Sequence, residues 1–581
     1  MLPRIRVAPF TSSFVQPDLR VVGASCTEVH VKRIPARPDL GHLKKQAKEL
    51  LAGYRSGDPA TLSRFRESLP LASGKEDPAI AALGLRLHDA QSCLAREYGF
   101  VSWTDLQGFV LARIAQANDP ARAVLLWLRA AYAGEISGGN NLARPAVAAR
   151  LLEESPGLLG DDPYLACAIG DEGVLRQAIA RDPGWVRRAG GPLLLPPLNA
   201  VAYSSLVQLP AFRERLRTCA KLLLDAGADP NQAVGSRWPP ASLASPSEED
   251  RLSALYGAAG QNRDVEITRL LLDAGADPND GESLYHSLEE PACTRLLLKA
   301  GARVGGTNAL YRVLDLDELE SLQLLLAHGG DPNEAAPGVP TSDWGRPLLW
   351  AIRRRRSAAH IAALLDAGAD ASVRTPEGID AHTLALRFGL TDVARLLARR
   401  TGGDTQLPPD EQFVAACARG DGPVARRIQA EHPEVVSTLS RTQLRLLPEL
   451  AAQSGCGEAV QLMVELGWPI ATTGGDWDGS ALNHAVFRGD AVLAGFLLAH
   501  GATWTEQHGF GDNVSGSLSW ASLNQPAEDG DWVGCAAALV AHGMPAAQPD
   551  PNGSDGVIVD GRLKWFSDEV TDYLLGASRA P

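Results

Sequence analysis

The hydrophobic residues of this chain gather in short runs that end at a glycine and recur along the sequence. Residues 222–231 read LLLDAGADPN, and residues 270–279 repeat this segment. Altered forms of it contain the glycines Gly301, Gly329, Gly368 and Gly501. Glycine adopts the left-handed conformation that a helix terminus needs, so each run predicts the end of an amphipathic helix. Because such a unit cannot bury its apolar face alone, the pattern indicates a solenoid of stacked repeats.

A different pattern precedes the repeats. The apolar positions of its first helix share one face at helical spacing: Leu43, Ala47, Leu50, Leu51 and Tyr54. Asp39 can cap this helix, and Asp58, Asp77 and Ser102 stand at further helix starts, two of them directly before a proline. The sequence therefore predicts a small helical bundle over residues 39–135.

The sequences of the predicted bundle and of the repeats both resemble a known family. Residues 43–50 (LKKQAKEL) and 89–103 (DAQSCLAREYGFVSW) resemble the N-terminal helical segment of many bacterial ankyrin-repeat proteins. Further matches to the opening of an ankyrin repeat stand at residues 196–201, 253–258, 308–313, 346–351 and 480–485. The resemblance implies an all-α ankyrin-repeat solenoid, made of helix-turn-helix units with finger loops. The N-terminal bundle would seal the first repeat or form a docking module of its own.

We expect this order along the chain: a basic, poorly ordered arm (1–38), the N-terminal bundle (39–135), a first ankyrin stack (141–400), a linker (401–410), a second stack (411–545), and a C-terminal hairpin with a capping helix (546–581). The linker is placed at Gly402, Gly403, Pro408 and Pro409 because glycine and proline interrupt helices. Insertions in the finger loops explain why the repeat spacing varies.

Composition narrows the class of partner. The net charge of -14 argues against binding to nucleic acid or to an anionic membrane, since either needs a basic face. The eight cysteines stand singly, which indicates reduced thiols rather than disulfides or a metal site. No apolar run is long enough to span a membrane. We therefore predict a cytoplasmic protein that binds no metal and no cofactor, and the resemblance implies that it is bacterial.

The common signatures of catalysis are missing from the sequence. It contains no phosphate-binding loop, no His-Glu-x-x-His motif and no Gly-x-Ser-x-Gly motif. A site built from other residues, such as His484 and Asp478, is the weaker, enzymatic alternative. The favoured prediction is that the chain is not an enzyme.

Aromatic residues give the best candidates for binding a partner. Tyr256, Tyr285 and Tyr311 occupy the same position in three successive repeats, where they either bridge neighbouring repeats or form a contact stripe. Three tryptophans extend the candidate surface on the concave face and the fingers: Trp344, Trp350 and Trp477. The basic run 353–356 is interpreted as a solvated helix end, with docking of an acidic peptide or phosphate as the alternative.

These observations predict a protein–protein interaction scaffold that binds another protein through its concave face and finger loops. The alternative is a regulatory protein whose N-terminal bundle docks a transcription or stress factor.

Overall fold

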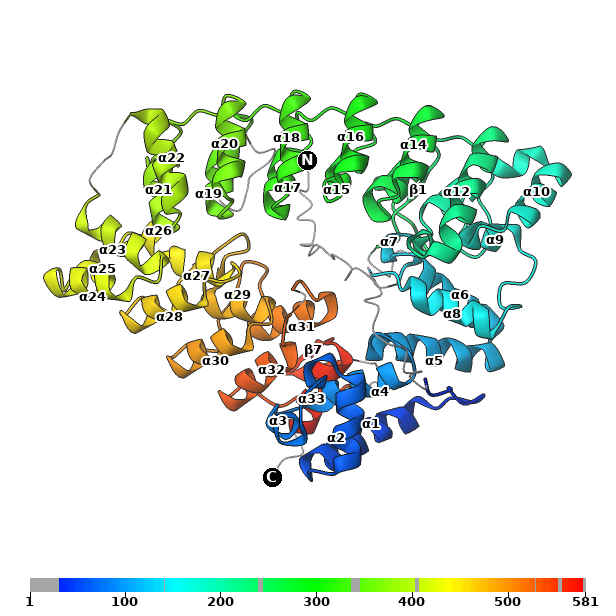
Figure 1. The fold of residues 1–581 in the computed structure, drawn as a ribbon, viewed down its shortest axis with the longest axis horizontal. Helices are drawn as coiled ribbons and strands as arrows, with labels where there is room; N and C mark the ends of the chain where they lie inside the picture. Colours follow the sequence, from blue (N-terminus) through cyan, green and yellow to red (C-terminus); the bar gives the residue numbers. More distant parts are fainter. Residues whose placement is uncertain are drawn as a thin grey trace. The chain divides into compact units, whose positions relative to one another are not determined.

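The structure is a computed structural model that describes residues 31–139, 142–238, 244–335, 345–402, 407–527, 529–551 and 556–577. These residues form two compact units, which meet along the chain between Ala302 and Arg303. Both units are built mainly from antiparallel helix pairs (Figure 1), which confirms the predicted all-α solenoid with its preceding helical bundle.

The first unit opens with the bundle. Its helices are α1 (Leu40–Arg55), α2 (Pro59–Ser68), the 3₁₀ turn η1 (Pro70–Ala72), α3 (Asp77–Ala81), α4 (Leu87–Glu97), α5 (Trp103–Asn118) and α6 (Pro120–Ala131). Asp39 accepts a hydrogen bond from the His42 amide, and Ser102 accepts one from the Asp105 amide, so both predicted caps are confirmed. The helix at Asp77 begins instead after Glu76, without a side-chain cap.

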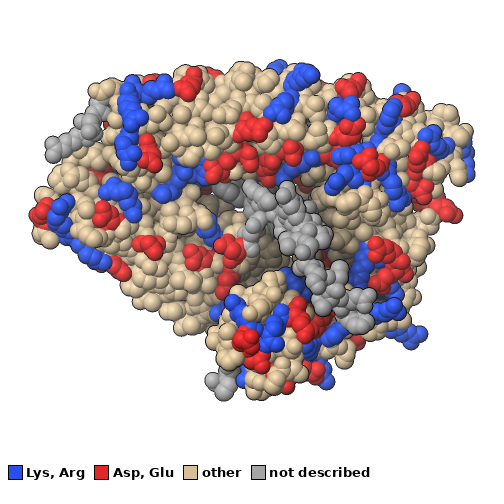
Figure 2. All heavy atoms as spheres, in the orientation of Figure 1, with Lys and Arg blue, Asp and Glu red and all other residues tan. Residues whose placement is uncertain are grey.

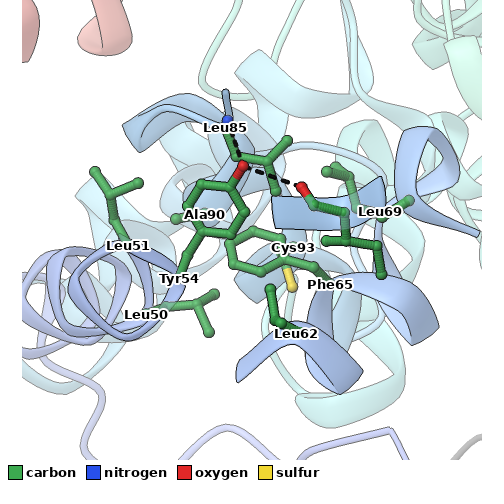
Figure 3. Close-up of a cluster of buried hydrophobic side chains, with 11 residues drawn as sticks. Leu50, Leu51, Tyr54, Leu62, Phe65, Leu69, Leu85, Ala90 and Cys93 are labelled. Atoms are coloured by element: carbon green, nitrogen blue, oxygen red, sulfur yellow. Dashed lines mark hydrogen bonds between the residues drawn. The ribbon is translucent and has the colours of Figure 1, made fainter. Parts of the chain in front are cut away.

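The core of the bundle lies between α1, α2 and α4. All five predicted apolar positions of α1 are buried. Tyr54 reaches furthest, and its ring packs edge-on against Phe65 at a centroid distance of 5.5 Å. Its hydroxyl lies 3.0 Å from the Ile80 carbonyl and accepts a hydrogen bond from the Leu85 amide at 3.2 Å (Figure 3). These two bonds satisfy the buried hydroxyl and fix the loop between α3 and α4.

The repeats of the first unit follow the bundle. Their elements are α7 (Gly134–Ser137), α8 (Pro145–Glu154), α9 (Pro163–Ile169), α10 (Glu172–Arg181), η2 (Pro183–Arg187), α11 (Pro197–Ala202), η3 (Ser205–Gln208), α12 (Pro210–Asp225), β1 (Ala233–Gly235), β2 (Arg251–Ser253), α13 (Ala254–Tyr256), the π-helical turn η5 (Gly257–Gln261), α14 (Val265–Asp273), α15 (Ser283–Ser287) and α16 (Pro291–Lys299). The first helices of successive pairs, α9, α11, α13 and α15, contact one another, as do the second helices α10, α12, α14 and α16. Each pair thereby covers the apolar side of its neighbour.

The second unit continues the repeats. Its elements are α17 (Ala309–Leu316), α18 (Leu319–Ala327), α19 (Pro347–Arg353), α20 (Ala358–Asp366), α21 (Ala381–Arg387), α22 (Thr391–Thr401), α23 (Pro409–Ala418), α24 (Gly422–Glu431), α25 (Val435–Thr438), α26 (Arg441–Leu444), α27 (Leu446–Ala451), α28 (Gly457–Glu465), β3 (Thr473–Gly474), β4 (Gly479–Ser480), α29 (Ala481–Phe487), α30 (Ala491–Ala499), α31 (Val514–Asn524), α32 (Trp532–Ala541), β5 (Gln548–Pro549), β6 (Val557–Val559), β7 (Arg562–Lys564) and α33 (Asp568–Ala577). Strands β5, β6 and β7 form a small antiparallel sheet in that order.

The second unit also contains the segment predicted to link two stacks. Helices α21 and α23 contact each other across residues 401–410, and Arg387 donates to Glu411 at 2.7 Å. Both of these side chains are buried. The compact units are therefore divided at Ala302, whereas the predicted linker lies inside the second of them.

The repeated Asp-Pro-Asn sequence connects neighbouring finger loops. Asn333 donates through Nδ2 to the Gly368 carbonyl at 2.9 Å and accepts through Oδ1 from the Asp370 amide at 2.8 Å. Asn231 makes the same pair of bonds to the next repeat, at 3.0 Å to the Gly275 carbonyl and 2.7 Å from the Asp277 amide. These hydrogen bonds between neighbouring repeats explain why the Asp-Pro-Asn sequence recurs in the finger loops.

The bridge can be tested at Asn333. We expect Asn333→Ala to lower the free energy of unfolding by about 1–2 kcal/mol, because it removes two inter-repeat hydrogen bonds at a solvated site. Ser372→Ala is the matched control, since Ser372 holds the same loop position one repeat later but bonds only locally to Asp370. Urea unfolding monitored by circular dichroism gives the comparison, and equal losses for the two variants would contradict the bridge.

Candidate partner-binding surface

In the first unit, the predicted tyrosine stripe is part of a buried aromatic group. Tyr256 packs against Tyr203 at a centroid distance of 6.1 Å and against His286 at 4.9 Å, and His286 in turn lies 5.0 Å from Tyr285. Tyr256 is 5 % exposed, whereas Tyr285 is half-buried. The Tyr256 hydroxyl donates to Glu135 at 2.8 Å, so this ring connects the repeats to α7.

Two glycines make room for these rings. A Cβ atom at Gly257 would lie 2.8 Å from the Tyr203 ring, and one at Gly260 would lie 2.5 Å from the Tyr256 ring. Both distances are too short for a real contact, so larger residues would displace the rings. Burial raises the pKa of the Tyr256 hydroxyl well above its ordinary value, which keeps it a hydrogen-bond donor to Glu135.

In the second unit, Tyr311 and Trp350 lie together. Their rings meet edge to face at 5.6 Å, and they are 3 % and 8 % exposed. The Tyr311 hydroxyl lies 2.6 Å from the Glu334 carbonyl, and Trp350 donates through Nε1 to Asp315 at 3.0 Å. Both polar atoms are thus engaged within the chain, and these two residues hold neighbouring repeats together.

A buried ion network surrounds Trp350 and connects distant repeats. Arg354 lies over the Trp350 ring at 4.5 Å and donates to Asp315 and to Asp476, each at 2.6 Å. Arg353 is fully buried and pairs with Glu449 at 2.9 Å and with Asp476 at 2.8 Å. Helix α19 is thereby joined to α27 and to the loop between β3 and β4.

The network stabilises the ionised form of its central carboxylate. Burial alone would raise the pKa of Asp476, but the guanidinium groups of Arg354 and Arg353 outweigh burial and hold that pKa well below the usual 3.8. The carboxylate is therefore ionised at neutral pH.

This arrangement corrects the interpretation of the basic run 353–356 as a solvated helix end. Arg353 and Arg354 are buried and paired with carboxylates of the same chain. The sequence offered no local signal for this pairing, because Glu449 stands 96 residues away from Arg353.

A second aromatic group reaches solvent, and we call it the aromatic row. It runs from Trp520 through Phe487, Trp477 and His508 to Phe510, with successive centroid distances of 5.1, 5.5, 5.2 and 5.9 Å. The first four are half-buried and Phe510 is 68 % exposed. The Gly509 amide donates to the Trp477 carbonyl at 2.8 Å, which holds the two finger loops together.

The remaining candidates are placed as follows. Trp344 lies outside the described residues, while the finger residue Trp238 is 39 % exposed. His484, named for the enzymatic alternative, is buried with Nε2 3.1 Å from the Gly474 carbonyl, and burial lowers its pKa. Asp478 is exposed.

The described residues contain no group of side chains with the geometry of a metal site. Each described cysteine is a buried free thiol. No helix in the described ranges has the length and apolar character needed to cross a membrane. On the face drawn in Figure 2, the described basic and acidic side chains are interspersed rather than gathered into one broad basic area.

Comparison with known proteins supports the fold. Residues 250–282, which run from β2 through α14 into the next finger loop, match the family model described as the ankyrin repeat. The repeat over residues 250–282 is therefore of the ankyrin type. Ankyrin repeats generally mediate contacts between proteins.

Similar solved structures include two ankyrin domains. The ankyrin repeat domain of human ASB11 is 20% identical, with a TM-score of 0.31, over 42% of this chain and 99% of that domain. The ankyrin repeat domain of Bcl-3, a member of the IkappaB family, is 23% identical, with a TM-score of 0.27, over 36% and 88%. A comparison with curated proteins gave no significant match.

Asp476→Asn tests the ion network. We expect it to lower the free energy of unfolding by roughly 3–5 kcal/mol, because two buried guanidinium groups lose a shared carboxylate. Asp478→Asn, two residues away and exposed, is the matched control and should change stability by less than about 0.5 kcal/mol. A small effect of Asp476→Asn in denaturant unfolding would show that the network contributes little.

The stability difference between the wild type and Asp476→Asn should also depend on pH. The folded pKa of Asp476 lies below its unfolded value of 3.8, so its contribution is complete above that pH. As the pH falls below 3.8, the carboxyl group of the unfolded chain takes up a proton while the folded one stays ionised, so the contribution declines. The stability difference between the wild type and Asp476→Asn should therefore be constant from neutral pH to about 4 and shrink below it. If the stability difference between the two proteins changes between pH 5 and 7, a group other than Asp476 causes it.

Proposed function

We propose that the chain is a non-enzymatic scaffold of the bacterial cytoplasm that binds a partner protein through the concave face and finger loops of its ankyrin repeats. The aromatic row supports this proposal most directly. Phe510 exposes most of its ring on a finger loop, although that loop is anchored to Trp477 by the Gly509 hydrogen bond. A preorganised aromatic side chain loses little entropy on binding, so it suits an interface anchor.

The other candidate residues divide into two roles under this proposal. Tyr285 and Trp477 are half-buried and can contact a partner directly. Tyr256, Tyr311 and Trp350 are buried, and they set the spacing of the repeats beneath the contact surface. Trp344 retains its predicted contact role.

Phe510 provides the test. A photo-crosslinking amino acid at position 510 of the full chain, used in lysate of the native source, should identify a partner, which is then purified. Phe510→Ala should weaken binding of that purified partner by about 30-fold, since an interface anchor contributes about 2 kcal/mol.

Val492→Ala is the control for this experiment. Val492 is 78 % exposed at the start of α30, outside the aromatic row, so the change removes exposed apolar surface of a similar kind. Isothermal titration should show unchanged affinity for this variant. Unchanged affinity for Phe510→Ala as well would remove the aromatic row from the interface.

A further inference from the structure

The N-terminal bundle carries an open groove of about 520 Å³. It is lined by Lys48, Leu51, Ala52 and Arg55 of α1, by Ser56 directly after this helix and by Leu87 at the start of α4. The groove lies over the bundle core, because Leu51 belongs to the buried cluster around Tyr54 (Figure 3) and Leu87 packs against that cluster.

The spacing along α1 creates the groove. Lys48, Ala52 and Arg55 follow one another at four and three residues, so they stand on one face of the helix. Ala52 is small and exposed, and it leaves an opening between two long cationic side chains. The floor is apolar, whereas the two ends are positively charged.

The charges at the two ends have no partner within the described chain. Helix α1 contains the cations Lys44, Lys45, Lys48 and Arg55 but a single acid, Glu49. Glu49 lies 3.7 Å from Lys45, on the exposed side of the helix. In the described ranges, neither Lys48 nor Arg55 forms an ion pair, although the protein as a whole has a net charge of -14.

We propose that this groove binds an acidic amphipathic helix of a partner protein. Leucine side chains of that helix fill the opening above Leu51 and Leu87, and two carboxylates pair with Lys48 and Arg55. The Cα atoms of Lys48 and Arg55 are about 10 Å apart along the axis of α1, which matches two turns of a bound helix. Charge complementarity selects this occupant over the basic N-terminal arm, which has the same sign as the groove.

The test uses the full chain and a synthetic peptide. The peptide is fluorescently labelled and helical, with leucines on one face and glutamates two turns apart beside them. Fluorescence anisotropy should show saturable binding that weakens with added salt. Replacing its leucines by serine, or its glutamates by lysine, should each reduce the affinity by about tenfold or more.

Three variants locate the binding. The double variant Lys48→Glu/Arg55→Glu reverses the charge of the groove, and Ala52→Trp fills the groove without a change of charge. Both should weaken binding by about tenfold or more. Lys45→Glu is the control, because it reverses one positive charge on the same helix outside the groove, and it should leave the affinity within about twofold.

Several outcomes would overturn the proposal. Equal weakening by Lys45→Glu would indicate a general charge effect, and tight binding to Ala52→Trp would place the peptide elsewhere. Binding of anionic lipid vesicles or double-stranded DNA in the groove, without binding of the acidic peptide, would assign a different ligand. Because the aromatic row lies in the other unit, the Phe510 experiment and this one can fail independently.

Discussion

Within each unit, a helix pair covers the apolar side of the next pair, and the rest of the structure depends on that mutual burial. A single pair exposes too much hydrocarbon to fold alone, so the repeats must be held at a fixed spacing. Short turns between the two helices of a pair supply part of that spacing, as at Asp171, Asp421 and Asp490, whose side chains each accept an amide hydrogen bond at the start of the next helix. Bridges such as Asn333 to Gly368 supply another part.

The features that the sequence predicted correctly are those set by neighbouring residues. Gly227, Gly275 and Gly501 adopt the left-handed conformation expected at helix ends. The buried stripe of α1 follows from helical spacing alone. Such features need only the residue's own backbone preference and the residues a turn away, and both are present in the sequence.

The features that the sequence could not predict depend on contacts between residues far apart in the chain. A run of arginines looks the same whether it faces water or a carboxylate, and the pairing of Arg353 with Glu449 forms only when remote repeats approach each other. The glycine and proline residues around 401–410 do interrupt a helix, but the contact between α21 and α23 and the Arg387–Glu411 pair still join the two sides. A boundary between two repeat stacks at 401–410 stays a prediction.

The buried tyrosines of the repeats are poorly suited to contact a partner, because the chain itself already engages them. Tyr256 and Tyr311 are equivalent in the sequence, yet each hydroxyl is engaged by the chain itself, by Glu135 in one case and by the Glu334 carbonyl in the other. A partner that bound these rings would first have to break those bonds and reopen packed contacts, which would consume the energy gained. An aromatic residue with an exposed ring on an anchored loop does not have to break such bonds before it contacts a partner. Phe510 is such a residue, and the groove on α1 meets the same requirement with cations whose charges the described chain leaves unpaired.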